Sequence, residues 1–134
     1  MALTVGYSGK PLYQKLGLAP GMVCLTINAP PNYHQLIDGA EDVKVSSRVR
    51  SADLVHVFCR TCRQLEARFP KALDRVGEGG MIWVSWPKKS SPLHADLSED
   101  GLRAIILPTG WVDVKVCAVD ADWSGLKFLK RRST

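Results

Sequence analysis

Three short apolar runs, separated by segments of helical character, constrain the fold more than any other feature of the sequence. The runs cover residues 22–27, 53–58 and 81–86, and each has the length of a buried strand. Strands that are joined through helices pair in parallel, and a parallel sheet is covered on both faces. The sequence therefore predicts an α/β fold that is Rossmann-like, with three layers in the order α/β/α.

The segment after the second run has the spacing of one face of a helix. Apolar side chains recur there at intervals of three and four, at Cys62, Leu65, Phe69, Leu73 and Val76. Pro70 lies inside this pattern, so we expect a break and a restart at that position. The glycine-rich residues 77–80 are expected to end the helix.

Weaker patterns complete the expected architecture. A short helix opens the chain from residues 8–11 onward, a second lies near residues 33–37, and a brief strand covers 43–45. A later helix begins at Asp96 or Ser98 and contains Leu102 and Ile106. Residues 112–118 alternate as a half-buried strand, and residues 126–131 pair back on it. We expect a mostly parallel sheet of about six strands with a C-terminal antiparallel hairpin, in a single domain over residues 1–134.

The net charge of +5 is concentrated at one end of the sequence. All charged residues of the segment 126–134 are basic, whereas the rest of the chain is close to neutral. This distribution indicates a solvated terminus, and we expect no nucleic-acid partner. The four cysteines indicate free thiols, and no apolar run is long enough to span a bilayer. Together with the first residues, which lack an export signal, these features predict a cytoplasmic location.

Several strings of residues resemble known families. The succession of strand, helix, residues 79–84, helix and hairpin resembles the second half of a class I S-adenosylmethionine-dependent methyltransferase. Most of the chain is also similar to a bacterial family known as domain of unknown function 3052, which implies no activity. That second resemblance depends on residues 7–12, 28–30, 83–89, 112–120 and 123–127.

The loop after the first strand lacks the features that hold a nucleotide cofactor. Rossmann-type sites place glycines there, so that backbone N–H groups can approach the ligand. Residues 28–33 instead contain Pro30 and Pro31, which remove two N–H donors, and no glycine. The second strand is followed by residues 46–48, which contain no acid to hold a ribose. We therefore expect a degenerate site with no cofactor, and S-adenosylmethionine is the alternative.

Ligands of open α/β sheets bind beyond the carboxyl ends of the strands. Loops after the three core strands would bring aromatic and cationic side chains to this edge, in a small pocket suited to a carboxylate or a phosphate. In the alternative interpretation the tryptophan packs in the core and the lysines are solvated. The candidate ligand-binding residues are Asn28, Asn32, Tyr33, Arg60, Ser85, Trp86, Lys88 and Lys89.

Cys59 and Cys62 form a CxxC motif at a strand-to-helix junction. A helix start with Arg60 and Arg63 beside it would lower the pKa of a thiol, which makes the pair a redox candidate. In the alternative interpretation both cysteines are packed in the core. One such motif without a second ligand pair predicts no metal site. His56 lies within a buried strand, and this position is typical of a core histidine.

Three functional hypotheses follow. The first is a non-catalytic module that binds a small anionic ligand or a protein partner on a degenerate methyltransferase-like scaffold. The second is an S-adenosylmethionine-dependent methyltransferase with an atypical cofactor loop. The third is a thiol-redox protein that uses Cys59 and Cys62.

Overall fold

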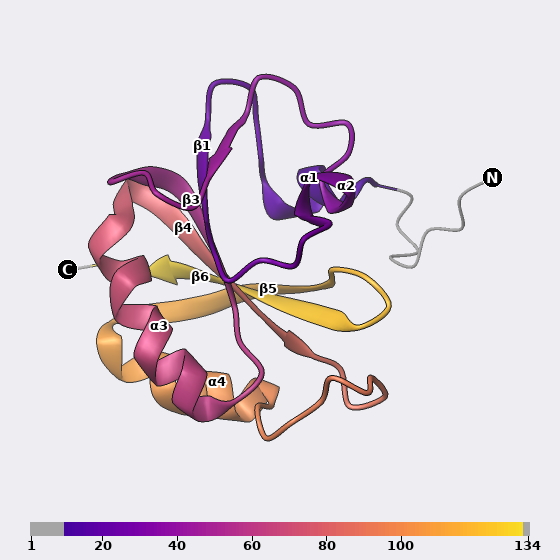
Figure 1. Cartoon of the computed structure of the whole chain (residues 1–134). Helices are drawn as coiled ribbons and strands as arrows, with labels where there is room; N and C mark the ends of the chain where they lie inside the picture. The colour runs from indigo at the N-terminus through magenta and orange to yellow at the C-terminus, as the bar shows by residue number, and fades with distance from the viewer. Residues whose placement is uncertain (1–9, 133–134) are drawn as a thin grey trace.

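The computed structural model describes residues 10–132 and contains one six-stranded sheet (Figure 1). The strands lie in the order β2-β1-β3-β4-β6-β5, and the first four pair in parallel. β6 pairs antiparallel with both β4 and β5. The strands are β1 (Val23–Ile27), β2 (Lys44–Ser46), β3 (Ala52–Phe58), β4 (Val76–Pro87), β5 (Trp111–Ala118) and β6 (Trp123–Lys130). This arrangement confirms the predicted α/β class and the C-terminal antiparallel hairpin.

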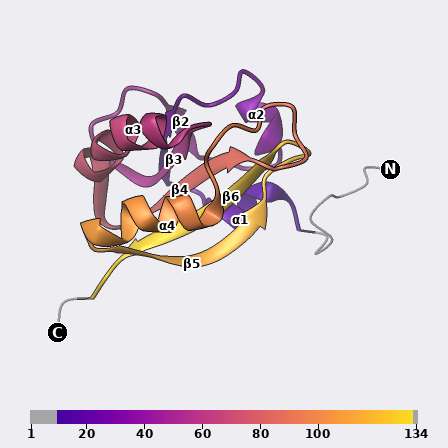
Figure 2. The same ribbon diagram turned by 90° about the horizontal axis from the view of Figure 1, so that it is seen from below.

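Helices cover both faces of the sheet. α3 (Cys62–Arg75) and α4 (Glu99–Ile106) pack together on one face, as Figure 2 also shows, and η1 (Leu107–Thr109) follows α4. α1 (Leu12–Leu16) and α2 (Tyr33–Leu36) lie on the other face. Among residues 10–132, no helix is long and apolar enough to cross a membrane. Residues 1–9, which include part of the expected helix start and of the string 7–12, lie outside the described chain, so the single domain over 1–134 stays a prediction.

Each face of the central strands has its own hydrophobic core. Val55 and Val57 of β3 pack towards α3 and α4, whereas Leu54 and Phe58 pack towards α1 and α2. On this second face the indole N–H of Trp83 donates to the Leu16 carbonyl oxygen at 2.9 Å. That hydrogen bond attaches the short helix α1 to the middle of the sheet. It matters for the position of the helix because α1 itself contributes few buried side chains.

The expected break at Pro70 is wrong, because α3 continues from Cys62 through Pro70 to Arg75. Pro70 is exposed, and so is Glu66, whose carbonyl group loses its helical partner at a proline four residues later. Water can therefore hydrate this carbonyl group on the outer side of the helix. The opposite side buries Leu65 and Phe69 against the sheet, which favours an uninterrupted helix.

The helix ends at Arg75, so Val76 begins β4 and does not extend the apolar face of the helix, and the glycine-rich segment lies within this strand. Val76 pairs with Ala52, and the next pair along the two strands joins Met81 to Leu54. The segment 77–80 between these pairs is therefore accommodated as an irregularity in the ladder. Gly80 is tightly enclosed, since a Cβ atom there would lie 2.9 Å from the Asp53 carbonyl oxygen.

A buried hydrogen-bonded network crosses the second core. His56 is 0% exposed; its Nδ1 lies 2.8 Å from the Tyr33 hydroxyl, and its Nε2 lies 2.6 Å from the Ser85 hydroxyl. A hydroxyl group can donate or accept, so a neutral imidazole is satisfied at both nitrogens. Burial lowers the pKa of His56 to about 3. These contacts confirm the prediction of a core histidine.

We predict that this histidine makes the fold sensitive to acid. The unfolded imidazole titrates near its ordinary pKa of 6.5, so the unfolded chain binds a proton that the folded protein resists. The contribution of the neutral His56 ring to the free energy of unfolding is therefore fully present above pH 6.5. It is lost as the pH falls towards about 3, by up to about 1.4 kcal/mol per pH unit. Urea unfolding between about pH 7 and 5 measures this slope.

The control compares two histidines. His56→Gln removes the titrating group, so we expect a shallower slope, whereas the exposed His34→Gln variant retains the slope of the wild type. If His56→Gln does not fold, NMR of the wild type gives the same information, because the His56 ring should show no titration down to about pH 5. A native ring that titrates near pH 6.5 would contradict the prediction.

Candidate functional site

The carboxyl ends of β1, β3 and β4 lie at one edge of the sheet because these strands are parallel. β1 pairs with β2 on one side and with β3 on the other, so the chain reverses its direction across the sheet at β1. Such a switch point is where open α/β sheets bind ligands. Two hollows lie along this edge, one beside β1 and one beside β4.

The β1 hollow has a volume of about 360 Å³ and lies where β1 and β2 end. It is lined by Thr26, Asn28, Ala29, Pro30, Pro31, Tyr33, His34, Val45 and Ser47. The volume falls within the range of sites for small organic ligands. Its walls combine apolar and polar side chains, with hydroxyl groups at the ends of both strands.

The backbone of the β1 hollow has a sharp turn without glycine. Asn28 has a φ of 58°, in the left-handed region where glycine usually supplies such a bend. Pro30 and Pro31 follow with no N–H groups, and α2 is a helix of only four residues. The hollow therefore offers fewer backbone donors than a glycine-rich loop does. Ser47 stands at the end of β2 in place of an acid.

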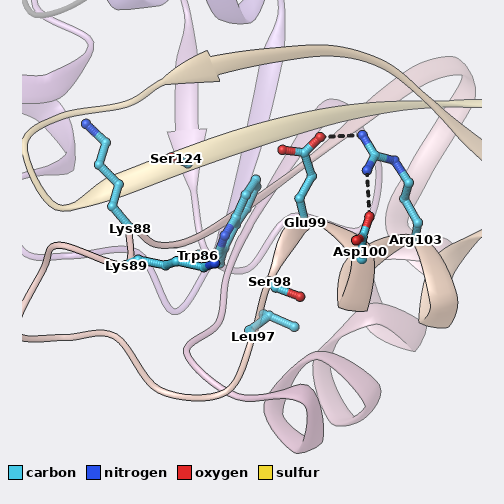
Figure 3. A pocket seen from close by; sticks show the side chains of 9 residues that line it. All are labelled: Trp86, Lys88, Lys89, Leu97, Ser98, Glu99, Asp100, Arg103 and Ser124. Atoms are coloured by element: carbon cyan, nitrogen blue, oxygen red, sulfur yellow. Dashed lines mark hydrogen bonds and ion pairs between the residues drawn. The ribbon is translucent and has the colours of Figure 1, made fainter.

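The β4 hollow has a volume of about 490 Å³ and lies between the end of β4, the start of β6 and α4 (Figure 3). It is lined by Trp86, Lys88, Lys89, Leu97, Ser98, Glu99, Asp100, Arg103 and Ser124. The Ser98 hydroxyl caps α4 by accepting the Gly101 N–H at 3.1 Å, which confirms one of the two predicted helix starts. The other candidate, Asp96, accepts the Cys62 N–H at 2.8 Å instead.

One arginine organises the acidic side chains around the β4 hollow. The Arg103 guanidinium donates to Asp113 at 2.9 Å, to Asp100 at 3.3 Å and to Glu99. These hydrogen bonds raise the pKa of Arg103, chiefly through Asp113 and Glu99. Because Asp113 belongs to β5, the ion pairs connect α4 to the terminal hairpin.

Hydrogen bonds hold the loop between β4 and α4 in place. Arg60 donates through Nε to the Leu93 carbonyl oxygen at 2.9 Å. The Ser91 hydroxyl donates to Asp122 at 2.9 Å, and the Lys88 N–H donates to the Asp122 carbonyl oxygen at 2.8 Å. The Asp120 carboxylate accepts the Asp122 N–H at 2.8 Å within the hairpin turn. The polar residues of the turn thus have structural partners.

The structure distributes the predicted ligand-binding residues over both hollows. Asn28 and Tyr33 line the β1 hollow, while Trp86, Lys88 and Lys89 line the β4 hollow. The other three, Asn32, Arg60 and Ser85, line neither of them. Tyr33 is 4% exposed and Ser85 is 0% exposed, and both hydroxyl groups contact His56.

Sequence reasoning missed the second wall of the β4 hollow. Glu99, Asp100 and Arg103 come from α4, and Ser124 comes from the start of β6. The spacing of Glu99 and Arg103, four residues apart in a predicted helix, was a usable signal for the ion pair. No local pattern indicates Ser124, because its position depends on how the hairpin pairs with β4.

The expected lowering of the thiol pKa in the CxxC motif is wrong. Cys59 is 1% exposed, and burial raises its pKa to about 11, against the smaller opposing effect of Arg68. Burial and the carboxylates of Asp96 and Glu66 raise the pKa of Cys62 as well. Within residues 10–132, no group of three or more His, Cys, Asp or Glu side chains is arranged to hold a metal ion.

No protein-family model matches the sequence, and no curated protein is found as a sequence relative. Solved structures do match. The chain is similar to an S-adenosylmethionine-dependent methyltransferase from Aquifex aeolicus, with a TM-score of 0.64 and 12% identity over 87% of this chain and 86% of that one. It is also similar to DhpI in complex with S-adenosylhomocysteine, with a TM-score of 0.60 and 13% identity over 92% and 83%.

A third match is 1,6-didemethyltoxoflavin-N1-methyltransferase from Burkholderia thailandensis, solved with S-adenosylhomocysteine bound. It has a TM-score of 0.57 and 12% identity over 90% of this chain and 75% of that one. Identities at this level relate folds and not activities. The chain therefore has the Rossmann-like fold of S-adenosylmethionine-dependent methyltransferases.

Proposed function

We propose that the protein is an S-adenosylmethionine-dependent methyltransferase with an atypical cofactor loop. The observation that carries this proposal is the β1 hollow, which lies at the carboxyl ends of β1 and β2, beside the switch point of a sheet with a methyltransferase-like fold. We also propose that the protein is related to domain of unknown function 3052 and that it is located in the cytoplasm. Cys24, Cys59, Cys62 and Cys117 are free thiols, which supports a reducing compartment.

We assign the adenine and the ribose of the cofactor to different residues of the lining. Ala29, Pro30 and Val45 offer an apolar surface to the adenine, and the hydroxyl group of Ser47 lies where β2 ends, in reach of a ribose. Asn28 turns the chain at the end of β1 and offers an amide side chain. S-adenosylmethionine, when bound, supplies a methyl group on a positively charged sulfur. Because the loop lacks glycine and an acid, we expect binding to depend mainly on apolar contact.

We predict that S-adenosylhomocysteine stabilises the protein and that Ser47→Trp removes this effect. Ser47 is exposed, so an indole at this position fills the hollow without disturbing the core. A ligand at a hundred times its dissociation constant adds about 2.7 kcal/mol to the stability of the wild type. Thermal unfolding with and without the ligand measures the difference.

Ser90→Trp is the matched control, since Ser90 is also exposed and does not line the β1 hollow. We expect the ligand to stabilise the wild type and Ser90→Trp to the same extent. A wild type that neither S-adenosylmethionine nor S-adenosylhomocysteine stabilises would contradict the proposed activity. Equal stabilisation of Ser47→Trp would contradict the proposed place of binding.

A second candidate is a non-catalytic module that binds a small anionic ligand or a protein partner. Pro30 and Pro31 favour it, because they remove backbone donors where a methyltransferase holds its cofactor. This candidate predicts no response to either adenosyl ligand. The thermal unfolding experiment therefore separates the two functions directly.

The structure gives little support to a thiol-redox function. A reactive thiol requires a lowered pKa and an accessible sulfur, and Cys59 has neither. We predict that Cys59 and Cys62 react with iodoacetamide at pH 7 no faster than an unstructured cysteine peptide does, as measured by mass spectrometry of the native protein. Fast alkylation of either thiol at pH 6 would restore the redox hypothesis.

A further inference from the structure

The β4 hollow has two ends of different electrostatic character (Figure 3). At one end Glu99 and Asp100 contact Arg103, so these carboxylates already have a cationic partner. At the other end are Lys88 and Lys89, whose ammonium groups make no ion pair or hydrogen bond with any side chain of residues 10–132. Within the described residues, the cations of the hollow that have no ion-pair partner are therefore the two lysines.

An apolar wall lies between the two ends. Figure 3 shows the Trp86 ring between Lys88 and the Arg103 group, and the Lys89 side chain extends towards Trp86. Trp86 is 7% exposed and Leu97 is 1% exposed, so both are anchored in the core, and a small part of Trp86 is left to line the hollow. An aromatic wall with a few polar groups is typical of sites for small organic ligands, and about 490 Å³ is sufficient for one.

The walls are formed before any ligand arrives. Arg60 and Asp96 connect the loop after β4 to neighbouring segments, through the Leu93 carbonyl oxygen and the Cys62 N–H. Asp122 accepts hydrogen bonds from Ser91 and from the backbone of Lys88, which fixes the start of this loop against the hairpin turn. A preformed site loses less conformational entropy on binding than a mobile one.

We propose that the β4 hollow binds a small organic anion, a phosphate or carboxylate attached to an apolar ring. The anionic group contacts Lys88 and Lys89, and the ring lies against Trp86. The carboxylates around Arg103 outnumber its single charge, so they repel an anion towards the lysine end. This site lies on the side of the sheet covered by α4, whereas Tyr33 of the β1 hollow packs on the other side. The two hollows share no lining residue, so the argument for this site does not rest on the proposed methyl transfer.

The test uses phenyl phosphate as the probe and the full chain labelled with ¹⁵N. We expect phenyl phosphate to shift the indole N–H signal of Trp86 and to leave that of Trp83, which is 0% exposed and faces the other core, unchanged. Lys88→Gln together with Lys89→Gln removes both charges, so the dissociation constant should rise about tenfold or more. Lys88→Arg with Lys89→Arg keeps the charge and should retain binding.

The matched control is Lys71→Gln with Lys130→Gln, which removes the same charge from two exposed lysines outside the hollow. We expect this variant to bind phenyl phosphate within about twofold of the wild type, and phenyl phosphate to bind more tightly than inorganic phosphate. No shift of Trp86 at millimolar phenyl phosphate would overturn the site. An equal loss in both glutamine variants would assign binding to net charge alone, and equal affinity for inorganic phosphate would overturn the role of the Trp86 wall.

Discussion

The parallel pairing of β3 with β4 is the constraint on which the rest of the structure depends, because both strands are buried on both faces. Neither face can be left to solvent, so α3 and α4 cover one core and the short helices α1 and α2 complete the other. The same burial admits His56 only as a neutral ring with two hydroxyl partners. Parallel pairing also brings the strand ends to one edge, where both hollows lie.

The sheet was predictable because its signal is local. Short apolar runs indicated β1, β3 and the main part of β4 with small errors at their ends, and glycine and proline bound the runs of β1 and β4. The behaviour of Pro70 was not predictable in this way, since a helix continues through a proline when its buried side is strong and its freed carbonyl group is hydrated. The prediction of a lowered thiol pKa was wrong because it, too, used only the neighbours in sequence. Basic neighbours in sequence indicated a lowered pKa, but burial of Cys59 has the larger effect.

The candidate site was predictable to the extent that it follows strand ends. Trp86, Lys88 and Lys89 share one hollow because they are close neighbours in sequence at the end of β4. Ser85 precedes Trp86 by one position and points to the opposite face, where it contacts His56. Arg60 also follows a strand, yet it holds the loop through Leu93. Such differences depend on contacts between distant segments, which no local pattern of residue types contains.

The fold and the cofactor loop lead to different expectations, and the proposed methyl transfer requires that the two be compatible. The fold is similar to that of an S-adenosylmethionine-dependent methyltransferase, whereas Pro30 and Pro31 reduce the backbone donors in the loop after β1. A crystal structure of the protein with saturating S-adenosylhomocysteine tests this compatibility most directly. We expect the adenosine to lie against Ala29 and Val45 with its ribose at Ser47. Adenosine density elsewhere on the protein, or a β1 hollow without ligand at saturation, would contradict the proposed cofactor site.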